Sequence, residues 1–279
     1  MRSKLFVPAI KPDLFAKALA TAADAICFDL EDAVPSNKKA EARGYLDAFL
    51  GSQSSNVAKR LLVRVNPANS ADFLEDLKAA VKPALFAVAL PKVEVVEEIH
   101  HAVELLSLVE RERGISSPMA LLITVESPRG LRGAYELAKS SPRICGLQLG
   151  FADLLEPLGI SLDNTVARQQ IRLMLRLAAG EAGVDCYEAA YPMFRDNAGL
   201  IAQLKDARAL GFAGASCVHP GQIEAANSIF TPTAEEVANA KAIVAAAEAA
   251  ERRGSAVVEL NGKMIDRPFI IRAKAIIQR

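Results

Sequence analysis

Residues 119–153 read MALLITVESPRGLRGAYELAKSSPRICGLQLGFAD and contain one complete strand–helix–strand unit. Residues 119–125 and 144–149 are nearly continuous apolar runs, and residues 130–139 between them have helical period. Strands that are almost entirely apolar, without alternation, are typical of a parallel sheet that is covered on both faces. This stretch therefore predicts one repeat of an α/β fold.

The same alternation continues on both sides of this stretch. Further strands are predicted at residues 5–8, 25–30, 60–65, 85–90, 184–188 and 214–218, and further helices at residues 12–23, 38–50, 73–81, 93–113, 165–182 and 198–210. Eight strand units predict a (β/α)8 TIM barrel, and the 279 residues are close to the roughly 250 of a typical barrel. An open doubly wound sheet is the alternative.

The last fifty residues have a different pattern. A helix is predicted at residues 234–251, then a turn at Gly254, a short extended segment at 256–260 before Asn261-Gly262, and a final helix at 268–278. Asn-Gly between short segments is a strong hairpin signal. We therefore expect a catalytic barrel over residues 1–230 and an extension over residues 231–279 that covers the barrel mouth or contacts another subunit.

Composition excludes several classes of partner. Lysine plus arginine and aspartate plus glutamate number 33 each, so no net field favours nucleic acid or an anionic membrane. No apolar stretch approaches the roughly 18 residues of a membrane span, which predicts a soluble, cytoplasmic protein. The four cysteines stand singly beside apolar runs, as is typical of buried reduced thiols. A small molecule is the expected partner.

The carboxyl ends of barrel strands carry the reacting groups in this kind of fold. The predicted strands place there a set of mostly acidic residues: Asp29, Glu31, Asp32, Arg64, Asn66, Lys92, Glu126, Asp153 and His219. Clustered carboxylates raise one another's pKa unless a cation compensates them. Magnesium commonly takes one or two protein carboxylates, a demand that Glu126 and Asp153 fit. Zinc is less favoured, because no two of the three histidines are spaced to chelate from one face.

Eight segments carry a resemblance to a known family: LFVPAIKPDLFAKALATAADAICFDLEDAV, LLVRVNP, ALPKVE, ITVESPRG, LQLGFADL, CVHPGQI, FTPTAEEV and NGKMIDRP, in this order. Together they resemble the citrate lyase beta-subunit-like family of the HpcH/HpaI aldolase/citrate lyase superfamily, over essentially the whole chain. The resemblance implies a Mg2+-dependent barrel that acts on coenzyme A thioesters as a homotrimer or hexamer.

The resemblance also implies roles for single residues. Glu126 and Asp153 fall on the two metal ligands of the family. Arg64 falls on an arginine that faces the thioester carbonyl or the substrate carboxylate. Glu31 and Asp32 belong to a D-L-E-D motif whose acids resemble groups that orient metal-bound water.

Three further features follow from the same resemblance. His219 and Pro220 are expected in a loop that fixes the backbone near the nucleotide end of coenzyme A. Asp266 matches an acid that reaches the active site from the tail of an adjacent subunit in relatives that also hydrolyse the thioester. Ala152 departs from the family, because many relatives carry asparagine at this position.

The predicted reaction is a retro-Claisen cleavage of a citramalyl-, malyl- or citryl-CoA-like thioester into an acyl-CoA and a keto acid. Magnesium on Glu126 and Asp153 would chelate the hydroxyl and carboxylate of the cleaved portion, and Arg64 would stabilise the enolate oxygen. The general base stays open between metal-bound water, Glu31 and Asp32.

Structural alternatives stand beside these assignments. Glu126 can be a helix-entry acid and Asp153 a helix cap. Arg64 can be an arginine that only pairs with the acids after the second strand. Lys92 is more typical of an ion-pair partner than of an imine-forming lysine. Asp266 can cap the last helix.

Two other functions compete with a thioester lyase. One is a metal-dependent aldolase that acts on free 2-keto acids without coenzyme A. The other is a citrate lyase complex subunit that needs an acyl-carrier partner. A requirement for the thioester distinguishes the lyase from the aldolase. Activity of the isolated protein distinguishes the lyase from the complex subunit.

Overall fold

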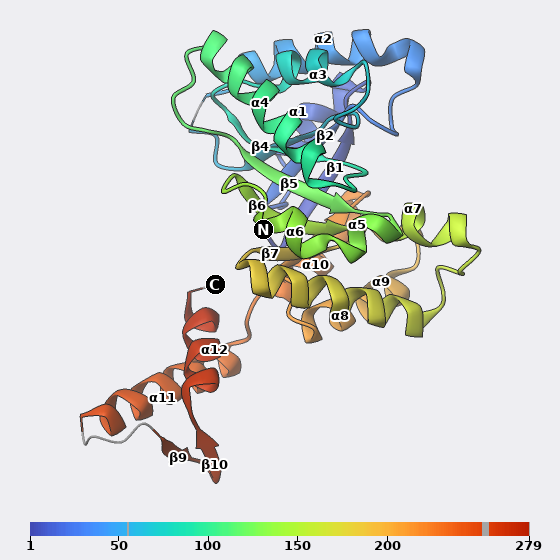
Figure 1. Cartoon of the computed structure of the whole chain (residues 1–279). Coiled ribbons are helices and arrows are strands. Elements are labelled where there is room, and N and C mark those ends of the chain that lie inside the picture. The colour runs from blue at the N-terminus through green and yellow to red at the C-terminus, as the bar shows by residue number, and fades with distance from the viewer. Residues whose placement is uncertain (55, 253–256, 279) are drawn as a thin grey trace. The chain divides into compact units, whose positions relative to one another are not determined.

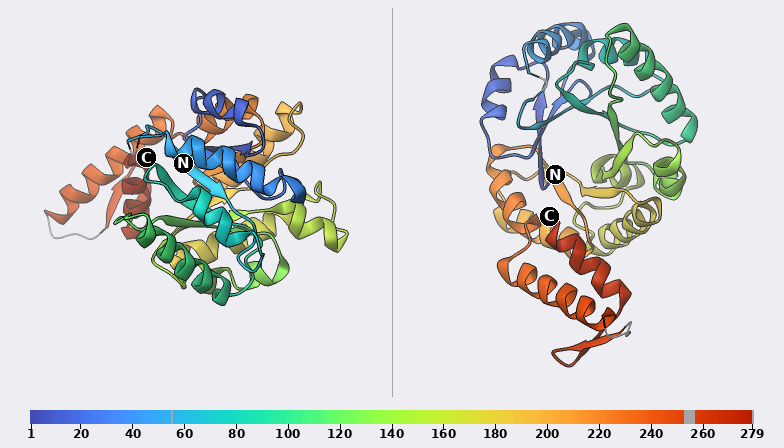
Figure 2. Two further views of the ribbon diagram at one scale, coloured as in Figure 1. Left: turned by 90° about the horizontal axis from the view of Figure 1, so that it is seen from above. Right: turned by 90° about the vertical axis from the view of Figure 1, so that its left-hand side faces the viewer.

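Eight parallel strands form a closed barrel in the order of the sequence. The computed structural model describes residues 1–54, 56–252 and 257–278. Figure 1 shows the elements along the chain, and the right-hand view of Figure 2 shows the helices of the barrel arranged around its strands. The strands are β1 Ser3–Pro8, β2 Ala25–Asp29, β3 Arg60–Arg64, β4 Leu85–Leu90, β5 Ala120–Val125, β6 Ile144–Leu149, β7 Asp185–Glu188 and β8 Gly214–Cys217. The predicted (β/α)8 barrel is confirmed.

Helices occupy the connections between these strands and follow the last of them. They are η1 Pro12–Leu14, α1 Phe15–Leu19, η2 Ser36–Lys38, α2 Lys39–Gly51, α3 Phe73–Ala80, α4 Val96–Glu112, α5 Pro128–Arg132, α6 Ala134–Lys139, α7 Phe151–Leu155, η3 Glu156–Leu158, α8 Thr165–Ala182, α9 Asn197–Ala209, η4 Pro220–Gln222 and α10 Ile223–Phe230, where η marks a 3-10 helix.

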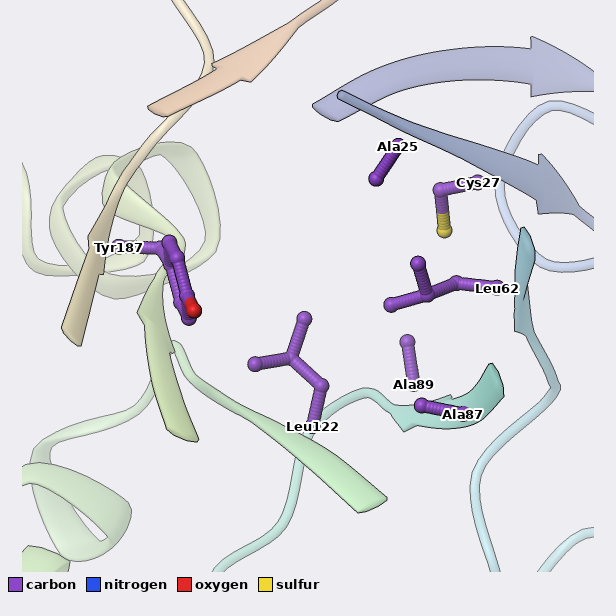
Figure 3. Close-up of a cluster of buried hydrophobic side chains, with 7 residues drawn as sticks. All are labelled: Ala25, Cys27, Leu62, Ala87, Ala89, Leu122 and Tyr187. Carbon is purple, nitrogen blue, oxygen red and sulfur yellow. The ribbon is translucent and has the colours of Figure 1, made fainter. Parts of the chain in front are cut away.

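The barrel interior is filled by a cluster of buried side chains from five strands. Figure 3 shows them converging on the barrel centre: Ala25, Cys27, Leu62, Ala87, Ala89, Leu122 and Tyr187. The three alanines leave room for the larger side chains of Leu62, Leu122 and Tyr187, as layered barrel packing requires. Because side chains alternate along a strand, residues two positions further on face the same interior. Asp29, Arg64 and Thr124 therefore continue these inward rows towards the mouth.

Three of the predicted helices begin, divide or end away from the predicted residues. The helix expected at 93–113 starts only at Val96, because Lys92 takes a left-handed conformation with φ of 54° and Val95 is extended. The side chain of Glu98 accepts the N–H of Val95 and so fixes this start. The helix expected at 130–139 is divided at Gly133 into α5 and α6. The helix expected at 12–23 ends already at Leu19.

The C-terminal residues form a second compact unit, Ile229–Arg279, separate from Met1–Ser228. It contains α11 Ala234–Glu251, β9 Val258–Leu260, β10 Lys263–Ile265 and α12 Arg267–Ile277. The two strands pair antiparallel across Asn261 and Gly262, whose φ angles of 53° and 74° suit a tight hairpin turn. The turn expected at Gly254 lies outside the described residues. Within the described ranges, no helix is long and apolar enough to cross a membrane.

Candidate active site

A pocket of about 360 Å3 opens at the carboxyl ends of the barrel strands. Glu126, Asp153 and Arg64 all line it, so the structure brings together the three residues on which the predicted chemistry depends. Its remaining walls are mostly small or apolar: Phe6, Pro8, Asp29, Ala33, Thr124, Gln148, Leu149, Gly150, Phe151, Ala152, Ala189, Ala190 and Val218. A polar floor inside apolar walls is the usual form of a small-molecule site.

Glu126 is held by the turn that follows β5. Ser127 caps α5, with its Oγ accepting the N–H of Gly130 at 3.0 Å, and Pro128 occupies the first helical position. The backbone N–H of Lys92 donates to Oε1 of Glu126 at 2.7 Å. The left-handed conformation of Lys92 thus belongs to the loop that orients this carboxylate.

Gly150 gives the Glu126 side chain its space. A Cβ at position 150 would lie 2.7 Å from the Cβ of Glu126 and closer still to its Oε2. Contacts this short do not occur between real side chains, so any larger residue would displace the carboxylate. Gly150 immediately precedes α7, and Asp153 stands in the first turn of that helix. One short segment therefore accommodates the first acid and supplies the second.

The electrostatics of Glu126 indicate an acid whose charge is only partly compensated, by the charge of Arg64. Burial raises the pKa of Glu126 to about 7, and the charges of Asp153 and Glu31 act in the same direction against the N–H of Lys92. A bound dication would reverse this shift and hold both carboxylates ionised. No three His, Cys, Asp or Glu residues cluster as a complete metal cage in the described part of the chain. Two carboxylates with open positions fit magnesium, which keeps water and substrate oxygens as its other ligands.

Arg64 is the centre of an ion-pair network with the acids that follow β2. Its Nε and Nη2 donate to the two oxygens of Asp29 at 2.7 and 2.6 Å, and its Nη1 lies 2.8 Å from Glu31 Oε2 and 3.4 Å from Asp32 Oδ2. The guanidinium carbon lies 5.1 Å from the ring centroid of Phe6. The pairing proposed as a structural alternative is therefore present, and Arg64 also lines the pocket.

Lys92 pairs with the other side of the same acids. Its Nζ lies 2.6 Å from Glu31 Oε1 and 3.3 Å from Asp32 Oδ1. The expectation of an ion-pair partner is confirmed, with these two acids as the partners. Burial raises the pKa of Glu31, while Arg64 and Lys92 lower it. Glu31 is thus held between two cations, and Asp32 is half exposed beside it.

The other predicted residues lie apart from the pocket lining. His219 is exposed beyond β8, accepts the N–H of Gly221 on Nδ1, and stacks on Phe194 at 5.4 Å between ring centroids. Pro220 begins η4 next to it. Asn66 is buried and donates from Nδ2 to Asp76 at 2.6 Å, which identifies it as a structural residue.

Asp266 belongs to the C-terminal unit and precedes α12. Its side chain makes no capping hydrogen bond to that helix. Its Oδ1 is buried and has no hydrogen-bond partner among the described residues. The cap that was the structural alternative for Asp266 is therefore not formed.

Sequence reasoning missed several residues that line the pocket. Thr124 and Gln148 stand two positions before Glu126 and Gly150, on the same inward rows of β5 and β6. Strand alternation could have identified them once the inward row was known. Phe151 was missed because the short helix α7 was not predicted.

Comparison with known proteins places the chain among lyases. A family model described as HpcH/HpaI aldolase/citrate lyase matches residues 2–220. Over 283 residues the chain is 35% identical to citrate lyase subunit beta of Haemophilus influenzae, covering 100% of this chain and 96% of the relative. Over 300 residues it is 30% identical to L-malyl-CoA/beta-methylmalyl-CoA lyase of Cereibacter sphaeroides, covering 100% and 94%.

A solved structure agrees with these relatives. The protein CitE of Mycobacterium tuberculosis, in complex with magnesium, acetoacetate and coenzyme A, matches with a TM-score of 0.78 and 30% identity, covering 100% of this chain and 98% of that one. The expected resemblance is confirmed, and the chain belongs to the HpcH/HpaI aldolase/citrate lyase family.

Proposed function

We propose that this protein is a magnesium-dependent carbon–carbon lyase that cleaves a hydroxyacyl-CoA thioester into an acyl-CoA and a keto acid. The observation that carries the proposal is the convergence of Glu126, Asp153 and Arg64 in one pocket at the barrel mouth. Relatives named as lyases, one of them for malyl-CoA, and a related structure with magnesium and coenzyme A support the same chemistry.

Glu126 and Asp153 would hold the magnesium ion, and Arg64 would face the thioester. The ion supplies Lewis acidity to the hydroxyl and carboxylate of the cleaved portion. Cleavage of the carbon–carbon bond leaves its electron pair on the acyl-CoA fragment as an enolate, while the hydroxyl loses its proton and becomes the carbonyl of the keto acid. The Arg64 guanidinium stabilises the enolate oxygen, and Asp29 and Glu31 hold it in place for that role.

Glu31 and Asp32 are the protein groups proposed to take the proton. Both lie beside Arg64 and Lys92, whose positive charges favour the ionised, proton-accepting form. Burial raises the pKa of Glu31, which brings this acid nearer to the pKa of an effective base.

His219 and Pro220 are proposed to contact the nucleotide end of coenzyme A. Both are exposed after β8, at the end of the barrel where the pocket opens. The stacked rings of His219 and Phe194 offer a flat surface to a base.

The protein is proposed to act as a homotrimer or hexamer. Helix α8 exposes a row of large apolar side chains, Val166, Leu173, Met174 and Leu177, whose exposed fractions run from 47 to 65%. Their spacing of seven, eight and eleven residues places them on one helix face. Contiguous exposed apolar surface of this kind is typical of subunit contacts.

A panel of thioesters tests the proposed function directly. Purified protein with magnesium is incubated with malyl-, citramalyl- and citryl-CoA and with the corresponding free hydroxy acids, and keto acid and free thiol are followed separately. We expect keto acid from at least one thioester and none from the free acids. Cleavage of free acids favours an aldolase, and no product from any member contradicts the proposal.

Replacing Gly150 by alanine should weaken magnesium binding. The new Cβ would displace the Glu126 side chain, and disturbed ligand orientation typically lowers metal affinity about 10- to 100-fold. Titration with Mn2+ measures the change. Gly44→Ala is the matched control, because a Cβ there meets nothing within 4 Å and should leave metal affinity unchanged.

Replacing Asp266 by asparagine should reduce thioester hydrolysis while metal binding is unchanged. If the tail of one subunit serves the pocket of another, mixing Asp266→Asn subunits with Glu126→Gln subunits should restore full hydrolysis at about a quarter of the sites, although each variant alone is impaired. Full hydrolysis by Asp266→Asn alone would show that Asp266 takes no part in the reaction. Mixtures without restored hydrolysis would show that Asp266 does not act in the pocket of another subunit.

A further inference from the structure

Lys4 is a buried charge that the proposed reaction does not use. It lies on β1 opposite Ala25 of β2, and its side chain is only 3% exposed. Its Nζ lies 4.7 Å from the ring centroid of Phe6 and donates a hydrogen bond to Oε1 of Gln148 on β6. A buried ammonium is unfavourable unless it is well paired, so its position between the pocket-lining residues Phe6 and Gln148 calls for an explanation.

An ammonium fixes which way the Gln148 amide points. Lysine carries three donors and no acceptor, so the amide must turn its carbonyl oxygen towards Nζ. The Nε2 group of the same amide then points away from Lys4. The positive charge behind the carbonyl also polarises the amide and strengthens its N–H donors.

The Nε2 group of Gln148 is available to a ligand. It donates no hydrogen bond to any of the residues that the structure describes, while Gln148 lines the pocket and is 5% exposed. Thr124 is the register partner of Gln148 on β5, is 3% exposed, and lines the same pocket. Two neighbouring strands therefore present an amide and a hydroxyl side by side, and the hydroxyl on β5 lies two residues before Glu126.

We propose that Lys4 is a positioning residue that orients the Gln148 amide, and that Gln148 and Thr124 together bind a carboxylate oxygen of the keto-acid portion of the substrate. The inference rests on the proposed function and adds an anchor formed by residues that are not metal ligands. Two donors from adjacent strands match the two acceptor directions of one carboxylate oxygen. The ammonium behind them selects a negative ligand over a neutral one.

The surroundings of Lys4 agree with this role. Burial lowers the pKa of Lys4 to about 8, with Arg64 acting in the same direction and Cys27, Cys145 and Asp29 opposing it. At neutral pH the amine is therefore still mostly protonated. Among the residues that the structure describes, no carboxylate forms an ion pair with Nζ, so its charge remains available to the amide.

Binding of pyruvate at saturating magnesium tests the inference without turnover. Calorimetry compares the parent with Lys4→Met, Gln148→Glu and Thr124→Val, and uses pyruvamide as a neutral analogue. Loss of one charge-assisted hydrogen bond should weaken pyruvate binding about 10- to 100-fold in Lys4→Met. Gln148→Glu keeps a partner for Lys4, so it should fold, yet it removes the donors and should weaken pyruvate binding at least as much.

Two controls separate positioning from general damage. Lys59→Met removes another lysine, whose Nζ donates to Thr21 and Ala23 carbonyls away from the pocket, and should leave pyruvate affinity unchanged. Mn2+ affinity should stay within about twofold in Lys4→Met, and pyruvamide should bind the parent and Lys4→Met equally.

The outcomes distinguish this inference from the proposed function. Pyruvate affinities of Lys4→Met and Gln148→Glu within twofold of the parent overturn the inference, even if the parent cleaves thioesters. Equal weakening of pyruvate and pyruvamide binding in Lys4→Met also overturns it, because the Lys4 charge then does not favour a negative ligand over a neutral one. A parent that neither cleaves any thioester nor binds pyruvate overturns both.

Discussion

Replacing Glu126 by glutamine is expected to lower lyase activity on the order of a thousandfold or more, because one of two protein ligands of the proposed magnesium ion is lost. Glutamine keeps the shape and can still accept the N–H of Lys92, so the loop that orients position 126 should be preserved. Steady-state kinetics at several magnesium concentrations measure the effect. Raising magnesium should recover little of the activity.

Stability measurements separate this loss from unfolding. Burial and the charge of Asp153 disfavour the ionised form of Glu126, which raises its pKa to about 7. A neutral amide removes that unfavourable charge, so the metal-free variant should melt no lower than the parent. Glu156→Gln, at an exposed acid in η3, is the matched control and should keep full activity. Normal kcat in Glu126→Gln would contradict the metal assignment.

Replacing Arg64 by methionine should affect both activity and stability. The variant loses the group proposed to face the enolate, and removal of a preorganised donor typically lowers kcat about 100- to 1,000-fold. It also leaves the carboxylates of Asp29 and Glu31 buried without their main cation, and breaking a buried pair typically lowers the free energy of unfolding by about 3–5 kcal/mol. Urea unfolding and kinetics measure the two effects separately.

A double variant shows which effect belongs to catalysis. Arg64→Met with Asp29→Asn removes one uncompensated charge and should recover part of the lost stability. Activity should stay low, because the enolate still lacks its partner. Recovery of kcat together with stability would show that Arg64 is only structural, the alternative that its ion pairs with Asp29 and Glu31 permit.

The repeating pattern of the sequence predicts the barrel because it depends on local signals. Strands β4 and β6 and helix α8 fall on the predicted residues, since each is a mostly apolar run or a long amphipathic segment. Placement of Glu126 and Asp153 at strand ends then follows from topology alone, because parallel strands end at one rim.

Other features depend on contacts between segments far apart in sequence. The left-handed Lys92 and the late start of α4 arise because the Lys92 N–H binds Glu126, thirty-four residues away. The need for glycine at position 150 arises from the Glu126 side chain on the neighbouring strand. The pairing of Lys4 with Gln148 spans the barrel. No local period or propensity encodes these contacts, so they appear only when the barrel closes.

The central claim is that Glu126 and Asp153 share one divalent ion at the mouth of the barrel. A crystal grown with Mn2+ in place of magnesium tests it most directly, because anomalous scattering locates the ion without reference to activity. The account predicts one strong peak bonded to carboxylate oxygens of both residues, at about 2.0–2.3 Å. A peak elsewhere, or no peak between these two carboxylates at saturating Mn2+, would contradict it.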